Sequence, residues 1–411
     1  VIRRLHTENG QIDEWITGNG GAVAPAPSPD GRYVAFVRRD RDKSVLNIFD
    51  NESGRQIPLF DGLSHDQQEA WAIFGPYPNM SWTPDSEHIV FWAQGGIHKI
   101  DVASREVSEI PFSADVEQTV VSAVRSDLPI EDGPFTVRMI RDAVTSPDGK
   151  WLVFHGAGYL WKKELPDGEP SRLTRGDAFE YEPAFSPDGR KLVYVSWSDD
   201  ELGGLHVIGV NGRGHKELSE QPGHYREPRF SPNGEMVTFR KEQGSFLQGY
   251  DYGLNPGLYW MDAKGGDENL ITRGGAEPAF TADNQGIYYL SGGGLEKTYK
   301  RIKLDGTDDH EVFKLKYIDR VVPSADGRWI AFNELYQAYV APLPPAGSVI
   351  DLNKDTKALP LRKVTVDVGS DLHWSNDTLH WLVGEAYFSQ PLKDMFAFVD
   401  GAPEELPEPD S

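Results

Sequence analysis

The sequence predicts an all-β fold, a β-propeller of four-stranded antiparallel blades, and three observations support this prediction. A short turn recurs eight times within the 411 residues. In seven of the copies, an aromatic residue follows the first residue of the turn after eight positions: Phe36, Phe91, Phe154, Tyr194, Phe239, Tyr289 and Phe332. Helical periodicity is nearly absent. Repeats spaced by roughly 40 to 60 residues are typical of radially arranged sheets, and we expect seven or eight blades, with eight favoured.

The recurring turn consists of Ser or Thr, usually Pro, then Asp or Asn, and usually Gly. Pro presets φ, Asp bonds the local backbone, and Gly accepts positive φ, so each copy predicts a tight hairpin turn. The close copies begin at Ser28, Thr83, Ser146, Ser186 and Ser231, and the looser copies begin at Thr281, Ser324 and Ser375.

Each copy predicts the two inner strands of a blade. Residues 183–185 read as a short inner strand before the turn at Ser186, and residues 190–195 read as the strand after it. Third and fourth strands follow in most units. The eighth copy differs, because its hairpin is about two residues shorter and leads to His380 and Trp381.

The two ends predict further parts of the chain. Residues 1–17 read as an N-terminal half-blade, residues 18–400 as the TolB-like propeller repeats, and residues 401–411 as a Pro/Glu-rich linker or tail. The half-blade would either complete the C-terminal blade and close the ring, or pair with repeats encoded upstream.

Composition excludes several classes of function. The chain has 41 basic and 64 acidic residues, a formal net charge of −23, which argues against nucleic acid as a partner. There is no cysteine, and no apolar run is long enough for a membrane span. The chain begins with Val1 rather than Met, so we expect a processed or truncated chain, and a periplasmic or secreted location in a bacterium.

No motif in the sequence predicts catalysis or a metal site. The eleven histidines include no His-x-His and no HExxH pattern, and no G-x-S-x-G nucleophile motif occurs. We therefore predict no catalytic residue, no metal ligand and no cofactor on this chain. An enzyme that uses channel carboxylates as acid and base is a weaker alternative.

Polar residues precede seven of the turns by four positions. In a propeller the innermost strand lines the central channel, so we expect these residues to circle one mouth of it. Such a ring would bind a peptide end, an amine or another cation; the alternative is a water-filled channel lined by hydrated side chains. These channel-mouth candidates are Asn79, Asp142, Glu182, Glu227, Glu277, Arg320 and Asp371.

Two insertions are rich in aromatic residues, and residues 224–227 place three functional side chains before an inner strand, where a structural turn is the plainer interpretation. Residues 243–256 and 61–78 would each form either an adhesive surface for a partner or a self-packed loop. The loop and partner candidates are His224, Tyr225, Phe246, Tyr250, Tyr252 and Trp71.

The repeated Ser-Pro-Asp-Gly turn with its β-run resembles the TolB-like (WD40-like, PD40) propeller repeat over essentially the whole chain. Residues 75–85, 109–118, 222–228, 333–342 and 372–375 are similar to the propeller region of large bacterial amidohydrolase-family proteins. This resemblance implies upstream repeats and a downstream hydrolase domain as partners from one precursor. It also implies that a divalent metal, zinc in such enzymes, belongs only to that downstream domain, whose histidines have no counterpart here.

Two functions follow as hypotheses. In the first, the chain is the non-catalytic propeller portion of a metal-dependent amidohydrolase-type hydrolase, which docks with the catalytic domain and controls substrate access or binding. In the second, it is a TolB-like peptide- or protein-binding module with no enzymatic role.

Overall fold

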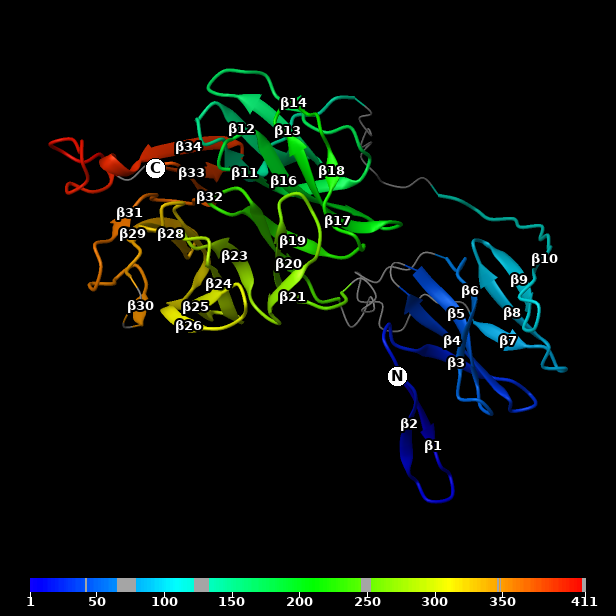
Figure 1. Cartoon of the computed structure of the whole chain (residues 1–411). Helices are drawn as coiled ribbons and strands as arrows, with labels where there is room; N and C mark the ends of the chain where they lie inside the picture. The colour runs from blue at the N-terminus through cyan, green and yellow to red at the C-terminus, as the bar shows by residue number, and fades with distance from the viewer. Residues whose placement is uncertain are drawn as a thin grey trace. The chain divides into compact units, whose positions relative to one another are not determined.

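The computed structural model describes residues 1–40, 43–64, 79–121, 133–244, 253–345, 347 and 349–408. The chain divides into two compact units, of which the first is Val1–Pro134 and the second begins at Phe135. The predicted all-β fold of four-stranded antiparallel sheets is confirmed (Figure 1). Within the described residues, helix is limited to one turn, η2 (Leu392–Asp394), and no helix among them is long and apolar enough to cross a bilayer.

The first unit contains a hairpin and two four-stranded sheets, each built in sequence order. The hairpin pairs β1 (Ile2–Leu5) with β2 (Ile12–Ile16). One sheet consists of β3 (Val23–Pro27), β4 (Tyr33–Asp40), β5 (Lys43–Asp50) and β6 (Gln56–Phe60). The other consists of β7 (Met80–Trp82), β8 (His88–Ala93), β9 (Gly96–Asp101) and β10 (Val107–Ile110).

The second unit contains six sheets, and the first three have four antiparallel strands each. The first sheet consists of β11 (Arg141–Thr145), β12 (Trp151–Gly156), β13 (Tyr159–Glu164) and β14 (Ser171–Arg172). The second consists of β15 (Phe179–Phe185), β16 (Lys191–Ser198), β17 (Leu202–Gly209) and β18 (Lys216–Glu217). The third consists of β19 (Tyr225–Phe230), β20 (Met236–Lys241), β21 (Gly257–Asp262) and β22 (Asn269–Thr272).

The last three sheets are less regular. The fourth consists of β23 (Ala276–Phe280), β24 (Gly286–Gly293), β25 (Glu296–Lys303) and β26 (His310–Lys316), with β30 (Ile350–Leu352) added in parallel. The fifth consists of β27 (Ile318–Pro323), β28 (Trp329–Glu334), β29 (Gln337–Pro342) and β31 (Arg362–Lys363). The sixth has three strands, β32 (Ser370–Ser375), β33 (Thr378–Val383) and β34 (Ala386–Pro391).

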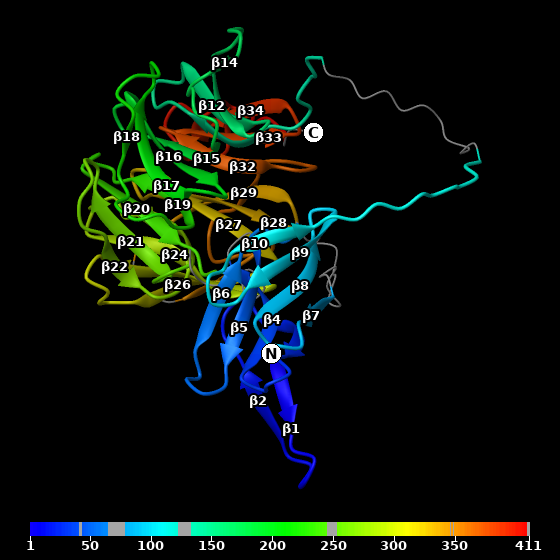
Figure 2. The same ribbon diagram turned by 90° about the vertical axis from the view of Figure 1, so that its right-hand side faces the viewer.

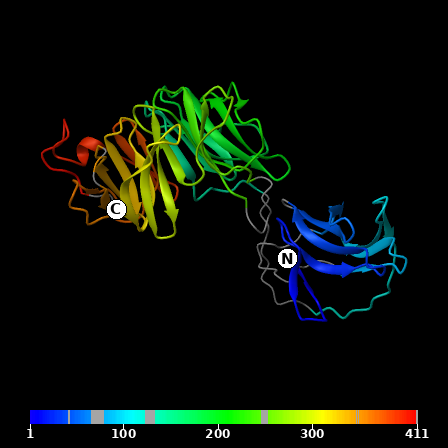
Figure 3. The same cartoon turned by 60° about the horizontal axis from the view of Figure 1, so that its bottom comes forward.

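The six sheets of the second unit form a closed ring. Their innermost strands contact one another in the order β11, β15, β19, β23, β27 and β32, and β32 contacts β11 (Figure 2). Figure 3 shows the same sheets from another side. The expected eight blades in one ring are not confirmed. Among the described residues, β1 and β2 pair with each other and with no strand of the sixth sheet.

The recurring turn forms because its side chains bond its own backbone. In the fourth copy, the Ser186 hydroxyl donates to Asp188 Oδ1 (2.6 Å), which also accepts from the Arg190 N–H (3.0 Å). The Ser186 Oγ accepts from the Lys191 N–H (3.0 Å). The pKa of Asp188 is lowered, chiefly by the Ser186 hydrogen bond. The same bonds recur at Ser28, Ser146 and Ser324, so the motif is a local structural device.

The core lies between neighbouring sheets. The aromatic residues that follow each turn are buried there: Phe36, Phe239 and Phe332 are 0% exposed. Phe332 packs against Phe313 and Leu315 of the preceding sheet, and Tyr194 packs against Leu160 and Leu173. Burying rings at one position of every sheet supplies the apolar contact that joins successive blades.

Candidate functional site

The channel-mouth residues of the second unit lie at bulges in the innermost strands. The pairing register shifts at Asp142, Glu182, Glu227, Glu277 and Asp371, and each of these residues has a φ between 50° and 56°. This left-handed conformation is unusual for residues with a side chain, so these positions are strained unless their surroundings stabilise them.

The carboxylates of the ring stabilise these bulges from sheet to sheet. Asp371 Oδ1 accepts from the Asp142 N–H (3.0 Å), and Asp142 Oδ2 accepts from the Glu182 N–H (3.2 Å). Glu182 Oε2 accepts from the Glu227 N–H (2.5 Å), and Glu227 Oε2 accepts from the Glu277 N–H (2.6 Å). Each carboxylate therefore connects its own sheet to the next one.

Arg320 completes the ring between the fourth and sixth sheets. Its Nε lies 3.9 Å from Glu277 Oε2, and its Nη1 lies 4.0 Å from Asp371 Oδ1. Its guanidinium thus bridges the two carboxylates at the ends of the hydrogen-bonded series. Because these groups flank it, the pKa of Arg320 is raised despite burial.

Arginines on the third sheet neutralise part of the ring. Arg226 donates to Glu182 Oε1 from Nη2 (2.6 Å) and Nε (2.8 Å). Arg240 lies 2.9 Å from Glu227 and 3.3 Å from Glu242, and Arg229 lies 3.5 Å from Glu277. The network contains six carboxylates and four guanidinium groups. The carboxylates are Asp142, Glu182, Glu227, Glu242, Glu277 and Asp371, and the guanidinium groups are Arg226, Arg229, Arg240 and Arg320.

Asp142 and Asp371 are the most weakly paired carboxylates of this network. Among the described residues, the basic side chain paired with Asp142 is His155, at 4.0 Å, and Asp371 pairs with Arg320, also at 4.0 Å. Burial raises the pKa of Asp142, and the charge of Glu182 raises it further. Burial also raises the pKa of Asp371. Burial opposes ionisation of Glu277 as well, but Arg320 and Arg229 hold its pKa below the usual value. A ligand cation would therefore gain most beside Asp142 and Asp371.

A central cavity of about 290 Å³ lies among the innermost strands, and Arg229 is the residue of the charged network that lines it. All six innermost strands contribute to its lining: Thr145, Ala184, Arg229, Ala279, Val322 and His373. A volume of this size is at the lower end of small-molecule sites, and it would hold one side chain or a peptide end rather than a folded domain.

The other predicted candidates lie elsewhere. Asn79 belongs to the first unit, before β7, and does not join the six residues of the ring. His224 lies beside the network, with its Nδ1 3.3 Å from Glu242 Oε2. The candidates Trp71, Phe246, Tyr250 and Tyr252 lie outside the described residues.

The prediction that Tyr225 contributes to a partner surface is corrected by its burial. Tyr225 is 0% exposed, packs against Phe239, and donates its hydroxyl hydrogen bond within the sheet, with Gln221 O and Glu268 Oε1 both at 2.8 Å. Tyr225 is the first residue of β19, and the alternation of side chains along this strand places the Tyr225 ring inside the core.

Sequence reasoning identified Arg320 but missed the other three arginines of the network, Arg226, Arg229 and Arg240. Arg226 directly precedes Glu227 and Arg229 follows it by two positions, so a register search around each carboxylate would have found them. Arg240 lies on the neighbouring strand, opposite Arg226, and only pairing of β19 with β20 brings it to the ring.

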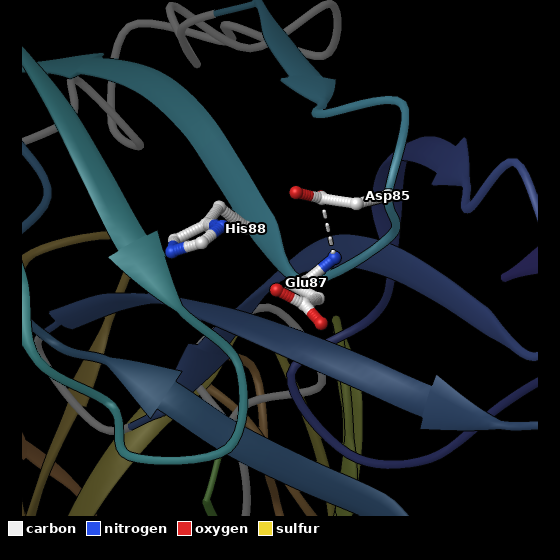
Figure 4. Close-up of side chains that lie close together, drawn as sticks. All are labelled: Asp85, Glu87 and His88. Carbon is white, nitrogen blue, oxygen red and sulfur yellow. Dashed lines mark hydrogen bonds between the residues drawn. The ribbon is translucent and has the colours of Figure 1, made fainter.

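One acidic group in the first unit has the composition of a cation site. Ligand atoms of Asp85, Glu87 and His88 lie within 4.8 Å of one another (Figure 4). Asp85 Oδ1, however, already accepts from the Glu87 N–H (3.0 Å) and the Thr83 hydroxyl (2.5 Å), as the corresponding residue does in six other copies of the turn. The turn itself accounts for this cluster.

The chain is similar to several known proteins over part or most of its length. No family model matches the chain. The chain is 28% identical over 189 residues to a Bacillus subtilis protein named as the uncharacterized peptidase YuxL, covering 46% of this chain and 24% of that protein. It is 26% identical over 192 residues to the uncharacterized protein Atu1656 of Agrobacterium fabrum, covering 45% of this chain and 58% of that protein. The chain thus spans less than two thirds of either relative.

Solved structures similar to the chain include TolB-like propellers and propellers of a lyase and a protease. A TolB of Agrobacterium tumefaciens is 20% identical, with a TM-score of 0.40, and the match covers 50% of this chain and 77% of that chain. An oligogalacturonate lyase in complex with manganese is 10% identical, with a TM-score of 0.45, covering 91% and 98% of the two chains. The tricorn protease is 12% identical, with a TM-score of 0.41, covering 92% and 38%. The chain is a β-propeller protein.

Proposed function

We propose that the chain is the non-catalytic propeller portion of a hydrolase, and that it recognises a cationic group of the substrate or of a partner domain at the channel mouth. The observation that carries this proposal is the weakly paired charge of Asp142 and Asp371, in a network that shares Arg229 with a cavity that six strands line. An ammonium or guanidinium group beside the two carboxylates would add counter-charge, and the narrow cavity would select an extended peptide end.

The resemblance to amidohydrolase-family propellers supports a metal-dependent parent enzyme, and the similarity to a protein named as an uncharacterized peptidase supports a hydrolase of some kind. In this proposal the propeller docks beside the catalytic domain and limits which substrates reach it. An exported location, periplasmic or secreted, belongs to the same proposal.

Calorimetric titration of the chain with a tripeptide that has a free N-terminus tests the recognition step. The matched control ligand is the N-acetylated tripeptide, which has no positive charge at that end. We expect the free amine to bind and the acetylated peptide to bind at least about tenfold more weakly. Asp142→Asn and Asp371→Asn should each weaken binding, whereas Asp319→Asn, at a side chain that is 84% exposed, should not. Equal binding of the two peptides would refute recognition of a cation.

A separate experiment tests the link to a hydrolase. The natural protein is compared with a form that lacks residues 135–408, using amide and ester substrates with added zinc. Loss of selectivity between substrates supports the proposed control of access, and unchanged activity and selectivity contradict it.

A second candidate function is a peptide- or protein-binding module of the TolB kind, with no enzymatic role. The same charged mouth favours it. Binding of the tripeptide together with unchanged hydrolysis would select this second function.

A further inference from the structure

The sixth sheet of the propeller lacks a fourth strand among the described residues. The first five sheets of the ring each have a fourth strand, whereas β32, β33 and β34 pair with no further strand. The chain that follows β34 does not return to its outer edge, because Leu392, Met395 and Phe396 pack against the fifth sheet. No strand of the described residues therefore pairs with the outer edge of β34.

A cavity of about 860 Å³ lies beside this edge, between the sixth sheet and the first. Figures 1 and 2 show β33 and β34 beside β12. The sixth sheet contributes His380, Tyr387 and Ser389 to the lining, and the first sheet contributes a largely apolar wall that includes Leu152, Phe154 and Trp161. We call this cavity the edge groove.

The junction between the fourth and fifth sheets shows what would fill such a groove. There, Tyr288, Tyr299 and Phe313 stack across β24, β25 and β26, with centroid separations of 5.4 and 6.2 Å. The third ring, Phe313, is 0% exposed and belongs to the fourth strand. It packs into a cluster with Ile330, Phe332 and Tyr339 of the next sheet.

The sixth sheet repeats the first two members of this stack. Tyr387 is opposite Leu382, as Tyr299 is opposite Leu290, and His380 stacks on Tyr387 at 5.5 Å.

The wall of the groove also repeats. Leu152 and Phe154 follow their turn by the same number of residues as Ile330 and Phe332, and Trp161 is opposite Phe154 as Tyr339 is opposite Phe332. The described residues provide no counterpart of Phe313 and Leu315, the members of the cluster that belong to the fourth strand.

His380 gives independent evidence for a ligand in the groove. His380 is 5% exposed, and its Nε2 has no hydrogen-bond partner in the described part of the chain. Its Nδ1 begins a series of three hydrogen bonds. His380 Nδ1 lies 2.6 Å from the Tyr387 hydroxyl, and this hydroxyl lies 2.9 Å from Thr145 Oγ1. Thr145 Oγ1 lies 2.8 Å from His373 Nε2.

The donor and acceptor of each hydrogen bond in this series follow from His373, the residue at its end. His373 Nδ1 lies 2.8 Å from the Asp371 carbonyl oxygen, which only accepts, so the Nδ1 carries the hydrogen. Burial lowers the pKa of His373 to about 3, so its Nε2 accepts from the Thr145 hydroxyl. Tyr387 must then donate to Thr145, and His380 Nδ1–H must donate to Tyr387. Burial lowers the pKa of His380 to about 4, so its Nε2 is left as an unpaired acceptor.

We propose that the edge groove binds an extended strand of another polypeptide, which pairs with β34 as the fourth strand of the sixth sheet. The bound strand carries an aromatic residue opposite Tyr387 and an aliphatic residue two positions further on, as Phe313 and Leu315 do in β26. A hydrogen-bond donor of the bound strand faces His380 Nε2.

The backbone of β34 has the alternation that this pairing requires. The two-residue turn Gly384-Glu385 joins the paired residues Val383 and Ala386. Because hydrogen-bonded and non-hydrogen-bonded pairs alternate, the N–H and C=O groups of Tyr387 and Ser389 face the outer edge. They would form main-chain hydrogen bonds with the added strand.

The probe is a nine-residue peptide with the sequence of residues 309–317 of this chain, labelled and titrated into the full chain. The control peptide has Ser in place of the residue corresponding to Phe313. We expect the first peptide to bind, the control to bind at least about tenfold more weakly, and the amides of Tyr387 and Ser389 to gain protection from hydrogen exchange.

Two variants locate the binding site. Ser389→Pro removes an edge N–H, and Ser389→Ala is its matched control because it retains that group. Gly156→Leu adds a side chain to the groove wall, where a Cβ would lie 3.5 Å from Trp161 Cδ1 and 3.7 Å from Phe154 Cε2. We expect Ser389→Pro and Gly156→Leu each to weaken binding at least about tenfold, and Ser389→Ala to leave it unchanged.

Absence of binding at millimolar peptide, equal binding of the two peptides, or binding that neither variant weakens would overturn the proposal. A dimer of the free chain that Ser389→Pro dissociates would overturn it as well, because a second copy would then occupy the groove. None of these variants lies in the ring at the channel mouth, so the result is independent of the proposed cation site.

Discussion

Replacement of Glu182 by Ala is expected to destabilise the propeller of the second unit. Glu182 has a side chain that is 16% exposed and joins the second sheet to the third in two ways. It accepts two hydrogen bonds from Arg226, at 2.6 and 2.8 Å, and one from the Glu227 N–H at 2.5 Å.

The size of the effect follows from these contacts. A hydrogen bond to a charged group contributes about 1.5–3 kcal/mol, and an unpaired buried N–H costs about 1–3 kcal/mol. Arg226 retains Glu242 at 3.3 Å, and loss of Glu182 relieves its repulsion of Asp142. We therefore expect Glu182→Ala to lower the free energy of unfolding by about 3 kcal/mol, and Glu182→Gln by about half as much, because its amide oxygen still accepts from Glu227.

Scanning calorimetry of the full chain measures this prediction. A change of 3 kcal/mol corresponds to a midpoint shift of about 6 °C or more for a unit of this size. Asp319→Ala is the control, since Asp319 pairs with Lys297 at 2.7 Å but is 84% exposed, and it should change stability by less than about 0.5 kcal/mol. If the two Ala variants differ by less than about 1 kcal/mol, the carboxylates do not hold the sheets together and our account of the ring is wrong.

Two further predictions concern acid stability and the turns. Burial lowers the pKa values of His206, His373 and His380 to about 4, 3 and 4, below the unfolded value near 6.5. Each buried neutral histidine therefore contributes folding stability that is fully present above pH 6.5. This contribution is lost as pH falls, by up to about 2 kcal/mol per histidine at pH 5. A free energy of urea unfolding that is unchanged between pH 7.5 and 5 would contradict this. Asp188→Ala should cost about 1–2 kcal/mol, whereas Asp188→Asn should cost little, because Asn233 accepts the equivalent bonds at 2.6 and 3.1 Å; equal losses in thermal unfolding would refute the turn chemistry.

The sequence predicted those parts of the fold that depend on local chemistry. The turn at Ser186 forms from its own side chains and backbone, so its four residues suffice to recognise it. The polar position four residues before each turn could be identified because the copies align with one another. The structure places Asp142 and five other residues at this position around one channel.

The parts that the sequence did not predict depend on contacts between distant residues. The ring closes after six sheets because β32 of the last sheet contacts β11 of the first. This contact joins two distant repeats, so no single repeat contains the information for it. Repeat spacing alone could not distinguish this closure from a ring of eight. The burial of Tyr225 was missed for a related reason, because the sequence reading places residues 224–227 before an inner strand, whereas Tyr225 is the first residue of β19.

The ring and the edge groove place different demands on a ligand. At the ring, Asp142 and Asp371 already accept backbone hydrogen bonds, from the N–H of Glu182 and of Asp142 respectively. A ligand would therefore be recognised through the negative charge of these two carboxylates. That charge acts on any cation of suitable size and gives little sequence specificity. At the edge groove, the slot opposite Tyr387 is shaped by Phe154 and Trp161, and the backbone of β34 fixes the register of a bound strand. Specificity for a polypeptide would therefore arise at the groove, whereas the ring would select only charge.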